Sequence, residues 1–392
     1  MLDDVSEDEV NLHMDRLLVE ARDLIGKLLP SSEAWNEQVT KDSIRHFVYG
    51  IGDNNPLYLN EEYASKVYGC LIAPPTFLYS VENPSYLGPP TPPCIACIQA
   101  GDEWEWYEII KVGDIVRWEK RITDVNETFG KYLGRMIFIT SECTYYNQTG
   151  AKIAKAKSKV IHYPAKFTKN LFNRSVSKYT EKQIRDLLNQ TRLISRRGHA
   201  VRYWEEVDVG EDISSVVKGP LTLGDLVAWF AGKGVPYKAC ELFALEVNSY
   251  PSLERPLPLI DIPSIGYKSH PEVIHVDANL AALYGIPAAF DEGPMRICWA
   301  AQMLTDWMGD EGFLKKLSVE ITDMNIYGDI TVWRGKVVQK SMDREPVVEC
   351  EIWATNQLGN ITAEGSATVI LPRRLPDSLP KVDFDQCSIK DV

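Results

Sequence analysis

The feature that most constrains the fold of this chain is an internal repeat. Three short blocks in the first part recur in the same order in the second part, at an offset of about 210–217 residues, which is the size of one domain. The paired blocks are Tyr58–Gly69 with His275–Gly285, Val112–Trp118 with Tyr327–Trp333, and Tyr146–Gly150 with Thr355–Gly359. This order predicts two copies of one domain.

The later blocks have the pattern of antiparallel strands and turns. Apolar and polar residues alternate from Val348 to Ala354, and lysines alternate with small or apolar residues from Lys155 to Val160. A two-residue period is typical of a sheet with one buried and one solvated face. We therefore expect an α+β fold in which a helix covers the dry face of each sheet.

Two further helices are expected outside the repeated blocks. Residues 6–29 carry apolar side chains at helical spacing behind Ser6 as N-cap, and Pro30 ends the helix. Within residues 166–195, Thr180 and Gln183 form a capping box. The expected organisation is an N-terminal helix (1–30), a first domain (31–165), a helical linker (166–200), a second domain (201–375) and a C-terminal tail (376–392).

Charge and cysteine content restrict the partners of the chain. With 42 basic and 55 acidic residues the net charge is −13, which disfavours nucleic acid and anionic membrane surfaces. No apolar run approaches the roughly 20 residues of a membrane span, and the acidic start lacks the pattern of a secretory signal. Eight irregularly spaced cysteines fit reduced thiols better than a disulfide framework. We expect a cytoplasmic protein.

The segment Gly52–Tyr58 (GDNNPLY) carries the most specific motif, and Ala64 and Ala73–Phe77 (APPTF) follow it. With these residues the chain resembles the MaoC-like (R)-specific enoyl-CoA hydratases and dehydratases, in particular the two-domain members with a dehydratase-like N-terminal half. The resemblance covers roughly residues 35–165 and 200–372. It implies a double hot-dog, in which each half wraps a curved antiparallel sheet around a central helix. A thioester would lie along the interface between the halves.

The motif of this family, Gly-Asp-x-Asn-Pro-x-His, is divided between the two halves. Asp53 and Asn55 stand at family positions in the first half, but Tyr58 replaces the histidine and is no ordinary general base at neutral pH. In the second half His275 stands at the histidine position, while Val235 replaces the aspartate. The second half is therefore the candidate catalytic half, and the first half its degenerate partner.

Hydration of a 2-enoyl thioester needs a base, an acid and donors for the enolate oxygen. His275 is the best candidate base, because imidazole titrates near neutrality. Asp291 is the leading candidate for its acid partner, and the resemblance implies that the amide of Gly293, at the start of an apolar helix, polarises the thioester carbonyl. His270 and Asp53 are weaker candidates. The simpler interpretations are a loop histidine and an N-capping aspartate.

Several residues are candidates for substrate binding. Arg296 is expected to pair with Asp291 or to contact a substrate phosphate. The basic stretch around Arg196 and Arg197 is a candidate rim for CoA phosphates, although cations at a helix end would explain it equally well. The remaining candidates in this set are Glu292, Tyr58 and Asn55.

The predicted function is reversible addition of water to a trans-2-enoyl-CoA, which gives a 3-hydroxyacyl-CoA. We expect this reaction to require no metal or redox cofactor. The altered first half points to a bulky or branched acyl group, by family analogy. Two other classes stay open: a hot-dog acyl-CoA thioesterase, which needs a carboxylate but no histidine, and a non-catalytic acyl-CoA-binding subunit. A homo-oligomer is expected, as is common in the family.

Overall fold

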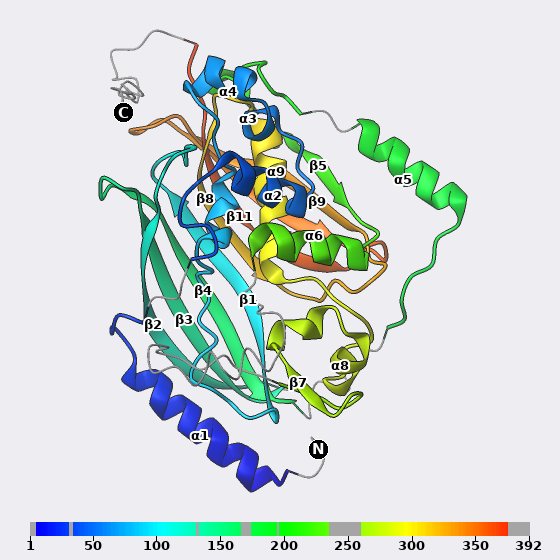
Figure 1. Ribbon diagram of the computed structural model, residues 1–392. Coiled ribbons are helices and arrows are strands. Elements are labelled where there is room, and N and C mark those ends of the chain that lie inside the picture. Colours follow the sequence, from blue (N-terminus) through cyan, green and yellow to red (C-terminus); the bar gives the residue numbers. More distant parts are fainter. Residues whose placement is uncertain are drawn as a thin grey trace.

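In the computed structural model one nine-stranded antiparallel sheet runs through the molecule (Figure 1). The structure describes residues 5–30, 34–130, 133–165, 174–193, 196–234 and 260–374. The strand order is β2-β3-β4-β1-β8-β11-β10-β9-β5, so the sheets of the two halves join at the β1–β8 pair. The strands are β1 (Ile95–Trp106), β2 (Arg117–Gly130), β3 (Gly134–Tyr146), β4 (Lys152–Pro164), β5 (Asp212–Lys218), β8 (Phe313–Ile321), β9 (Thr331–Ser341), β10 (Val347–Thr355) and β11 (Ile361–Ile370), and β6 (Ile260–Ile262) and β7 (Tyr267–Ser269) form a separate hairpin.

Helices α2, α6 and α9 lie on one face of this sheet, whereas α5 stands away from it (Figure 1). The α-helices are α1 (Glu7–Asp23), α2 (Lys41–Ile51), α3 (Pro56–Leu59), α4 (Glu61–Tyr68), α5 (Glu181–Leu193), α6 (Leu223–Lys233), α8 (Ala278–Leu283) and α9 (Gly293–Met308), and the 3₁₀ helices are η1 (Pro75–Ser80), η3 (Trp204–Glu206) and η4 (Pro271–His275). In the described ranges, no helix is long and apolar enough to cross a membrane.

The central helix of the second half is α9, and every residue from Pro294 to Met308 is buried. A helix that is buried all round belongs to the core of the protein. In the first half the six-residue 3₁₀ helix η1 takes the corresponding place, and it too is buried from Thr76 to Ser80. The predicted α+β class and the two helix-and-sheet units are therefore confirmed, with a much shorter central helix in the first unit.

The two halves also pack against each other through α2 and α6. A Cβ atom on Gly50 would lie 2.8 Å from the carbonyl oxygen of Ala228, and one on Gly232 would lie 2.4 Å from that of His46. Each glycine therefore lets the partner helix approach closely, and the two occupy equivalent places near the ends of their helices. After α2 the chain passes directly into the first motif, because Gly52 is the C-cap of this helix.

The repeated Asn-Gln-x-Gly blocks form the same turn twice. Gln148 accepts a hydrogen bond from the amide of Ile115 (3.1 Å), and Gln357 accepts one from the amide of Ile330 (2.9 Å). Gln148 also donates to Asp114 (3.2 Å), and Gln357 donates to Asp329 (2.8 Å). The internal repeat thus reflects a duplicated hydrogen-bond pattern.

The expected outer helices are also present. Ser6 caps α1 by accepting from the amide of Glu9, and Thr180 and Gln183 bond to each other's backbone or side chain before α5. α1 ends at Asp23, before Pro30, because the following residues bridge to β2 at Ile122 and Arg121. Residues 235–259, which include Val235, lie outside the described residues. So do 1–4, 166–173, 194–195 and the tail 375–392. The domain boundaries stay a prediction.

Candidate active site

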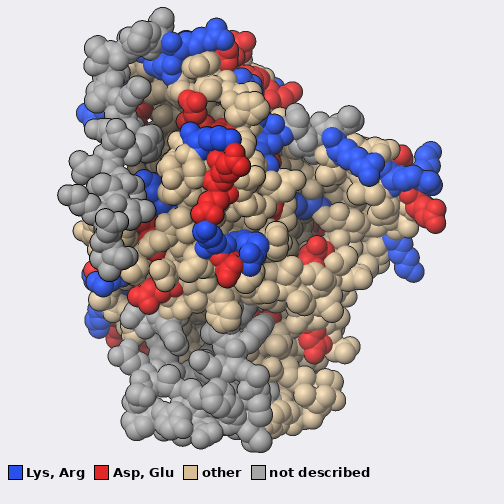
Figure 2. Space-filling model, turned by 45° about the horizontal axis from the view of Figure 1, so that its top comes forward, with Lys and Arg blue, Asp and Glu red and all other residues tan. Residues whose placement is uncertain are grey.

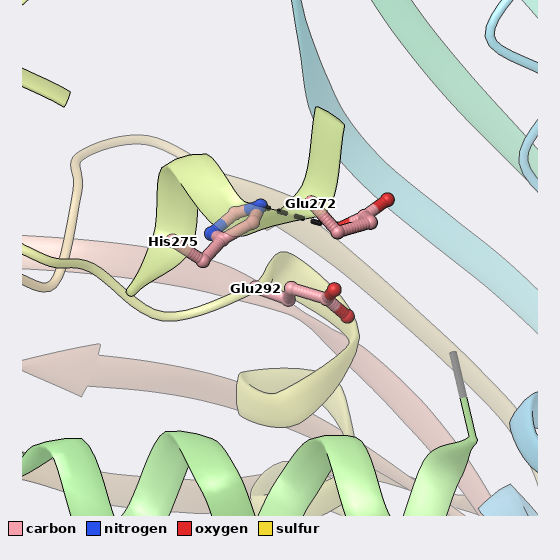
Figure 3. A group of neighbouring side chains, drawn as sticks. All are labelled: Glu272, His275 and Glu292. Carbon is pink, nitrogen blue, oxygen red and sulfur yellow. Dashed lines mark ion pairs between the residues drawn. The ribbon is translucent and has the colours of Figure 1, made fainter. Parts of the chain in front are cut away.

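His275 and Glu272 come from one turn, the 3₁₀ helix η4. Pro271 begins this helix, and His270 caps it by accepting from the amide of Glu272 (3.3 Å). Because residues three apart eclipse each other on a 3₁₀ helix, the two side chains share one side. Their separation is 3.6 Å, from His275 Nε2 to Glu272 Oε2 (Figure 3). His270, a weaker catalytic candidate, thus has a structural role at the start of the turn.

The imidazole of His275 is oriented by Phe290. The Nδ1–H group donates to the carbonyl oxygen of Phe290 (3.2 Å), and the amide of Phe290 donates to the carbonyl oxygen of His275 (3.1 Å). This arrangement leaves Nε2 as an acceptor that faces the carboxylates. Burial lowers the pKa of His275, although the charge of Glu292 acts in the opposite direction. The ring is therefore a neutral base near pH 7.

Glu292 provides the second carboxylate, at the N-cap position of α9. Its Oε2 accepts from Trp229 Nε1 (2.9 Å) and from the ammonium of Lys233 (2.5 Å), both on α6. Burial would raise the pKa of Glu292, but the neighbouring groups, above all the charge of Lys233, outweigh it and lower that pKa. The carboxylate of Glu292 is thus held ionised although only 5% of the residue is exposed.

Glu272 has the opposite character. Burial, followed by the negative charge of Glu292, raises the pKa of Glu272. Two neighbouring carboxyl groups whose pKa values are driven apart are the usual arrangement for one proton donor and one stabilising anion. The site therefore combines a neutral imidazole, a protonated carboxylic acid and an ionised carboxylate.

Among the described residues, the same three side chains form a group whose ligand atoms could hold a metal ion. One ligand atom each from Glu272, His275 and Glu292 lies within 4.8 Å of the others. The ammonium of Lys233 already neutralises Glu292, and a cation at the centre would have to share that carboxylate with it. The donor set is therefore better suited to proton transfer than to a resident cation.

The expected partnership between His275 and Asp291 is corrected by the structure. Asp291 forms an ion pair with Arg296 (Oδ2 to Nε, 2.8 Å) and accepts from Asn325 (3.2 Å) on the other side of the chain. Arg296 also donates to the carbonyl oxygens of Asp323 and Thr362, and 3% of it is exposed. Arg296 is thus buried and connects α9 to the segments around Asp323 and Thr362, with Asp291 as its counterion. It does not contact a substrate phosphate in this position.

Gly293 stands where the resemblance places it, as the first residue of α9 directly after Glu292. The positive end of the helix dipole and the amides of the first turn favour developing negative charge there. The 16-residue helix that begins there is buried from Pro294 to Met308. Its role as an oxyanion donor stays a prediction.

The motif of the first half is closed by the chain's own residues. Asp53 accepts from the amide of Asn55 (2.8 Å) and pairs with Arg196 (3.1 Å), which also pairs with Asp306 on α9 (2.5 Å). Tyr58 is 3% exposed, and burial followed by the charge of Asp53 raises its pKa. Asp306 follows Gly293 by 13 residues, or roughly 20 Å of helix, so Asp53 is too far from His275 to be its partner.

The basic stretch predicted to bind CoA phosphates is mostly occupied internally. Arg196 forms the double ion pair above, and Arg197 donates to the carbonyl oxygens of Ala200 (2.8 Å) and Val201 (3.0 Å). Lysines and arginines on the face shown in Figure 2 are interspersed with aspartates and glutamates. Arg196 and Arg197 are thus engaged by the chain's own groups, and a role in binding CoA phosphates stays a prediction for them.

A small apolar cavity lies beside the closed motif, at the far end of α9. It leaves about 40 Å³ for the centres of water-sized molecules. Its lining includes Tyr58, Asn55, Trp106, Met308 and Leu314. Asn55 caps α3 through its side chain, which accepts from the amide of Leu57 (3.0 Å). Tyr58 and Asn55 thus shape a pocket, without a base beside them that matches His275.

Comparison with known proteins agrees with this fold. Residues 25–156 match the family model of the FAS1-like dehydratase domain region. A probable enoyl-CoA hydratase alpha subunit of Thermomonospora curvata is 23% identical over 163 residues, which is 37% of this chain and 51% of that protein. The chain therefore spans about half the length of this curated relative.

Two solved structures show the same architecture over most of the chain. A MaoC-like dehydratase aligns with a TM-score of 0.62 and 14% identity, over 90% of this chain and 99% of that one. A conserved hypothetical protein of Mycobacterium tuberculosis, described as a double hot-dog, aligns with a TM-score of 0.53 and 9% identity, over 90% and 98%. The chain is a double hot-dog protein. Its resemblance to the MaoC-like hydratases and dehydratases is confirmed.

Proposed function

We propose that this protein is a hydro-lyase that adds water reversibly to a trans-2-enoyl-CoA and forms a 3-hydroxyacyl-CoA. The observation that carries the proposal is the cluster of Glu272, His275 and Glu292 at the start of α9, with its neutral base, protonated acid and fixed anion. The hydratase-like and dehydratase-like relatives support the same class of reaction.

The proposed reaction uses each group once. His275 Nε2 takes a proton from water as the oxygen forms its bond to C3, and the electron pair of the C2–C3 double bond moves to the thioester as an enolate. The first amides of α9, beginning with Gly293, stabilise the enolate oxygen. Glu272 then protonates C2, which completes the 3-hydroxyacyl thioester.

The site then returns to its starting state by an internal proton transfer. After one turnover His275 carries a proton and Glu272 has lost one, and their 3.6 Å separation allows transfer through a short rearrangement or one water molecule. Glu292 stabilises the imidazolium while it exists, and Lys233 with Trp229 holds Glu292 in place. The acyl group we propose is bulky or branched, on the analogy of the altered first half.

The test follows the enoyl-thioester absorbance over a panel of 2-enoyl-CoAs, from short linear to bulky ring-bearing chains. Wild type is expected to consume the absorbance and form 3-hydroxyacyl-CoA without free CoA, and Glu272→Gln and His275→Ala to lose the activity. His199→Ala, at an exposed position, is the matched control and should keep the wild-type rate. Release of free thiol would favour the thioesterase, and no reaction on any substrate would favour an acyl-CoA-binding subunit.

A further inference from the structure

Strand β1 of the first half reaches the start of α9 in the second half. A β-bulge between Gln99 and Gly101 shifts the register against β4 at this point. Because of the extra residue, Gln99 and Asp102 turn to the same face, although they are three positions apart in sequence. Bulges are common next to active sites, where they redirect a side chain.

Gln99 lies directly against the first residue of α9. A Cβ atom on Gly293 would sit 3.0 Å from Gln99 Oε1 and 3.5 Å from its Cδ. Only a glycine at position 293 leaves room for this contact without displacing the carboxamide. Since Gly293 directly follows Glu292, the carboxamide borders the proposed active site.

A buried network determines which end of the carboxamide faces that site. Gln99 Nε2 donates to Asp102 Oδ1 (2.6 Å) and to Ser158 Oγ (3.3 Å). Tyr79 donates to the other oxygen of Asp102 and accepts from Trp104 Nε1 (2.9 Å). An aspartate that receives several donors orients the amide, so the Oε1 of Gln99 points toward Gly293.

The network has no other function in the proposed reaction. Asp102, Tyr79 and Trp104 are each 2% exposed, so a polar chain has been built into the core of the first half. It ends at Gln99 Oε1, to which no described residue donates a hydrogen bond. A buried network that leaves one acceptor free at a site boundary is suited to a donor supplied by a ligand.

We propose that Gln99 is a specificity-determining residue of the second half's active site, whose Oε1 accepts a hydrogen bond from the 3-hydroxyl group of the product or from the water that becomes it. Asp102 is its positioning residue. The active site is then composite, since β1 of the first half supplies the acceptor. This inference rests on the proposed hydration reaction and adds how the hydroxyl is recognised.

The test separates hydroxyl recognition from binding of the rest of the thioester. It uses the 2-enoyl-CoA that wild type hydrates fastest, its 3-hydroxyacyl-CoA product, and the saturated acyl-CoA of the same carbon skeleton as an inhibitor without a hydroxyl. Gln99→Met keeps the approximate shape and removes the acceptor. We expect roughly a 3- to 10-fold loss in kcat/KM in both directions, with an unchanged inhibition constant for the saturated acyl-CoA.

Asp102→Asn should give the same pattern with a smaller loss, because the carboxamide of Gln99 can then turn over. Circular dichroism and thermal melting check that each variant folds, and Gln99→Leu repeats the test if Gln99→Met is unstable. Equal losses for the hydroxylated and saturated ligands would show a steric role and overturn the proposal, as would wild-type kinetics in both Gln99 variants. Absence of hydration in wild type would overturn the proposed function and this inference together.

Discussion

The two motif regions lie at opposite ends of α9 and differ in how their buried carboxylates are neutralised. At the first motif, Arg196 from the linker forms ion pairs with both carboxylates, Asp53 and Asp306. At the second motif, Lys233 forms an ion pair with only one of the two carboxyl groups, that of Glu292. Glu272 lies beside His275 instead. Buried charge is thus neutralised in both places, but only the second keeps a proton that can be moved. The difference shows how a duplicated fold can retain one reactive site and turn the other into structure.

The largest expected effect separates the two ends by their chemistry. His275→Ala should lower kcat for hydration by about 10²–10⁴-fold, the usual contribution of a positioned base. Tyr58→Phe, at the equivalent place in the first half, should change kcat by less than about 3-fold, because Tyr58 has no place in the proton transfers. Steady-state kinetics on the same enoyl-CoA measures both. A loss in Tyr58→Phe as large as in His275→Ala would mean that the first motif is catalytic.

The next effect separates them by stability. Lys233→Met removes the ion-pair partner of Glu292, and Arg196→Met removes that of Asp53 and Asp306. Each change should lower the free energy of unfolding by about 3–5 kcal/mol. Adding Glu292→Gln to Lys233→Met should recover part of that loss, since no buried charge is then unpaired. Urea denaturation measures the free energies. Arg196→Met should retain activity at temperatures where it is folded, whereas Lys233→Met should not, and the reverse result would exchange the roles of the two sites.

A smaller effect is expected from pH at the closed site. Burial, followed by the charge of Asp53, raises the pKa of Asp306 to about 6. The folded state then binds more protons than the unfolded state between about pH 4 and 6, so this group's contribution to stability is present at low pH and is lost as the pH rises through that window. A shift of this size is worth roughly 3 kcal/mol at most. Urea denaturation from pH 4 to 7 should show a flatter profile for Asp306→Asn, and an unchanged slope would contradict it.

How much the sequence could predict differs between fold and site. The repeat predicted two similar units because turns such as Asn147–Gly150 depend on local hydrogen bonds that short sequences encode. The same local logic placed His275, which lies at the start of a matched block. The acid groups were harder. Asp291 and Glu292 are adjacent acids before one helix, and only packing decides that the first turns to Arg296 and the second to Lys233.

Sequence reasoning missed two residues of the proposed active site, Glu272 and Gln99, for a related reason. Glu272 precedes His275 by three residues in a segment that begins with proline, and this spacing, read as a 3₁₀ turn, would have paired them. Gln99 carried no such signal, because its approach to Gly293 depends on a bulge and on the β1–β8 junction between the halves. Contacts that cross between duplicated units depend on how the units dock, which no local pattern records.

The smallest effect tests the duplication itself, at the two glutamine turns. Gln357 is half-buried and also donates to Ser177 (2.7 Å) from the linker. Gln148 is exposed and, among the described residues, bonds only to Asp114 and to the amide of Ile115. Gln357→Ala should therefore lower the free energy of unfolding by about 1–2 kcal/mol and Gln148→Ala by about 0.5 kcal/mol. Both variants remove the same side chain from equivalent turns, so urea denaturation compares the two copies. Equal losses would mean that the linker adds nothing to the second turn. A larger loss in Gln148→Ala would mean that the first copy, despite its closed motif and short central helix, is the one whose stability limits the chain.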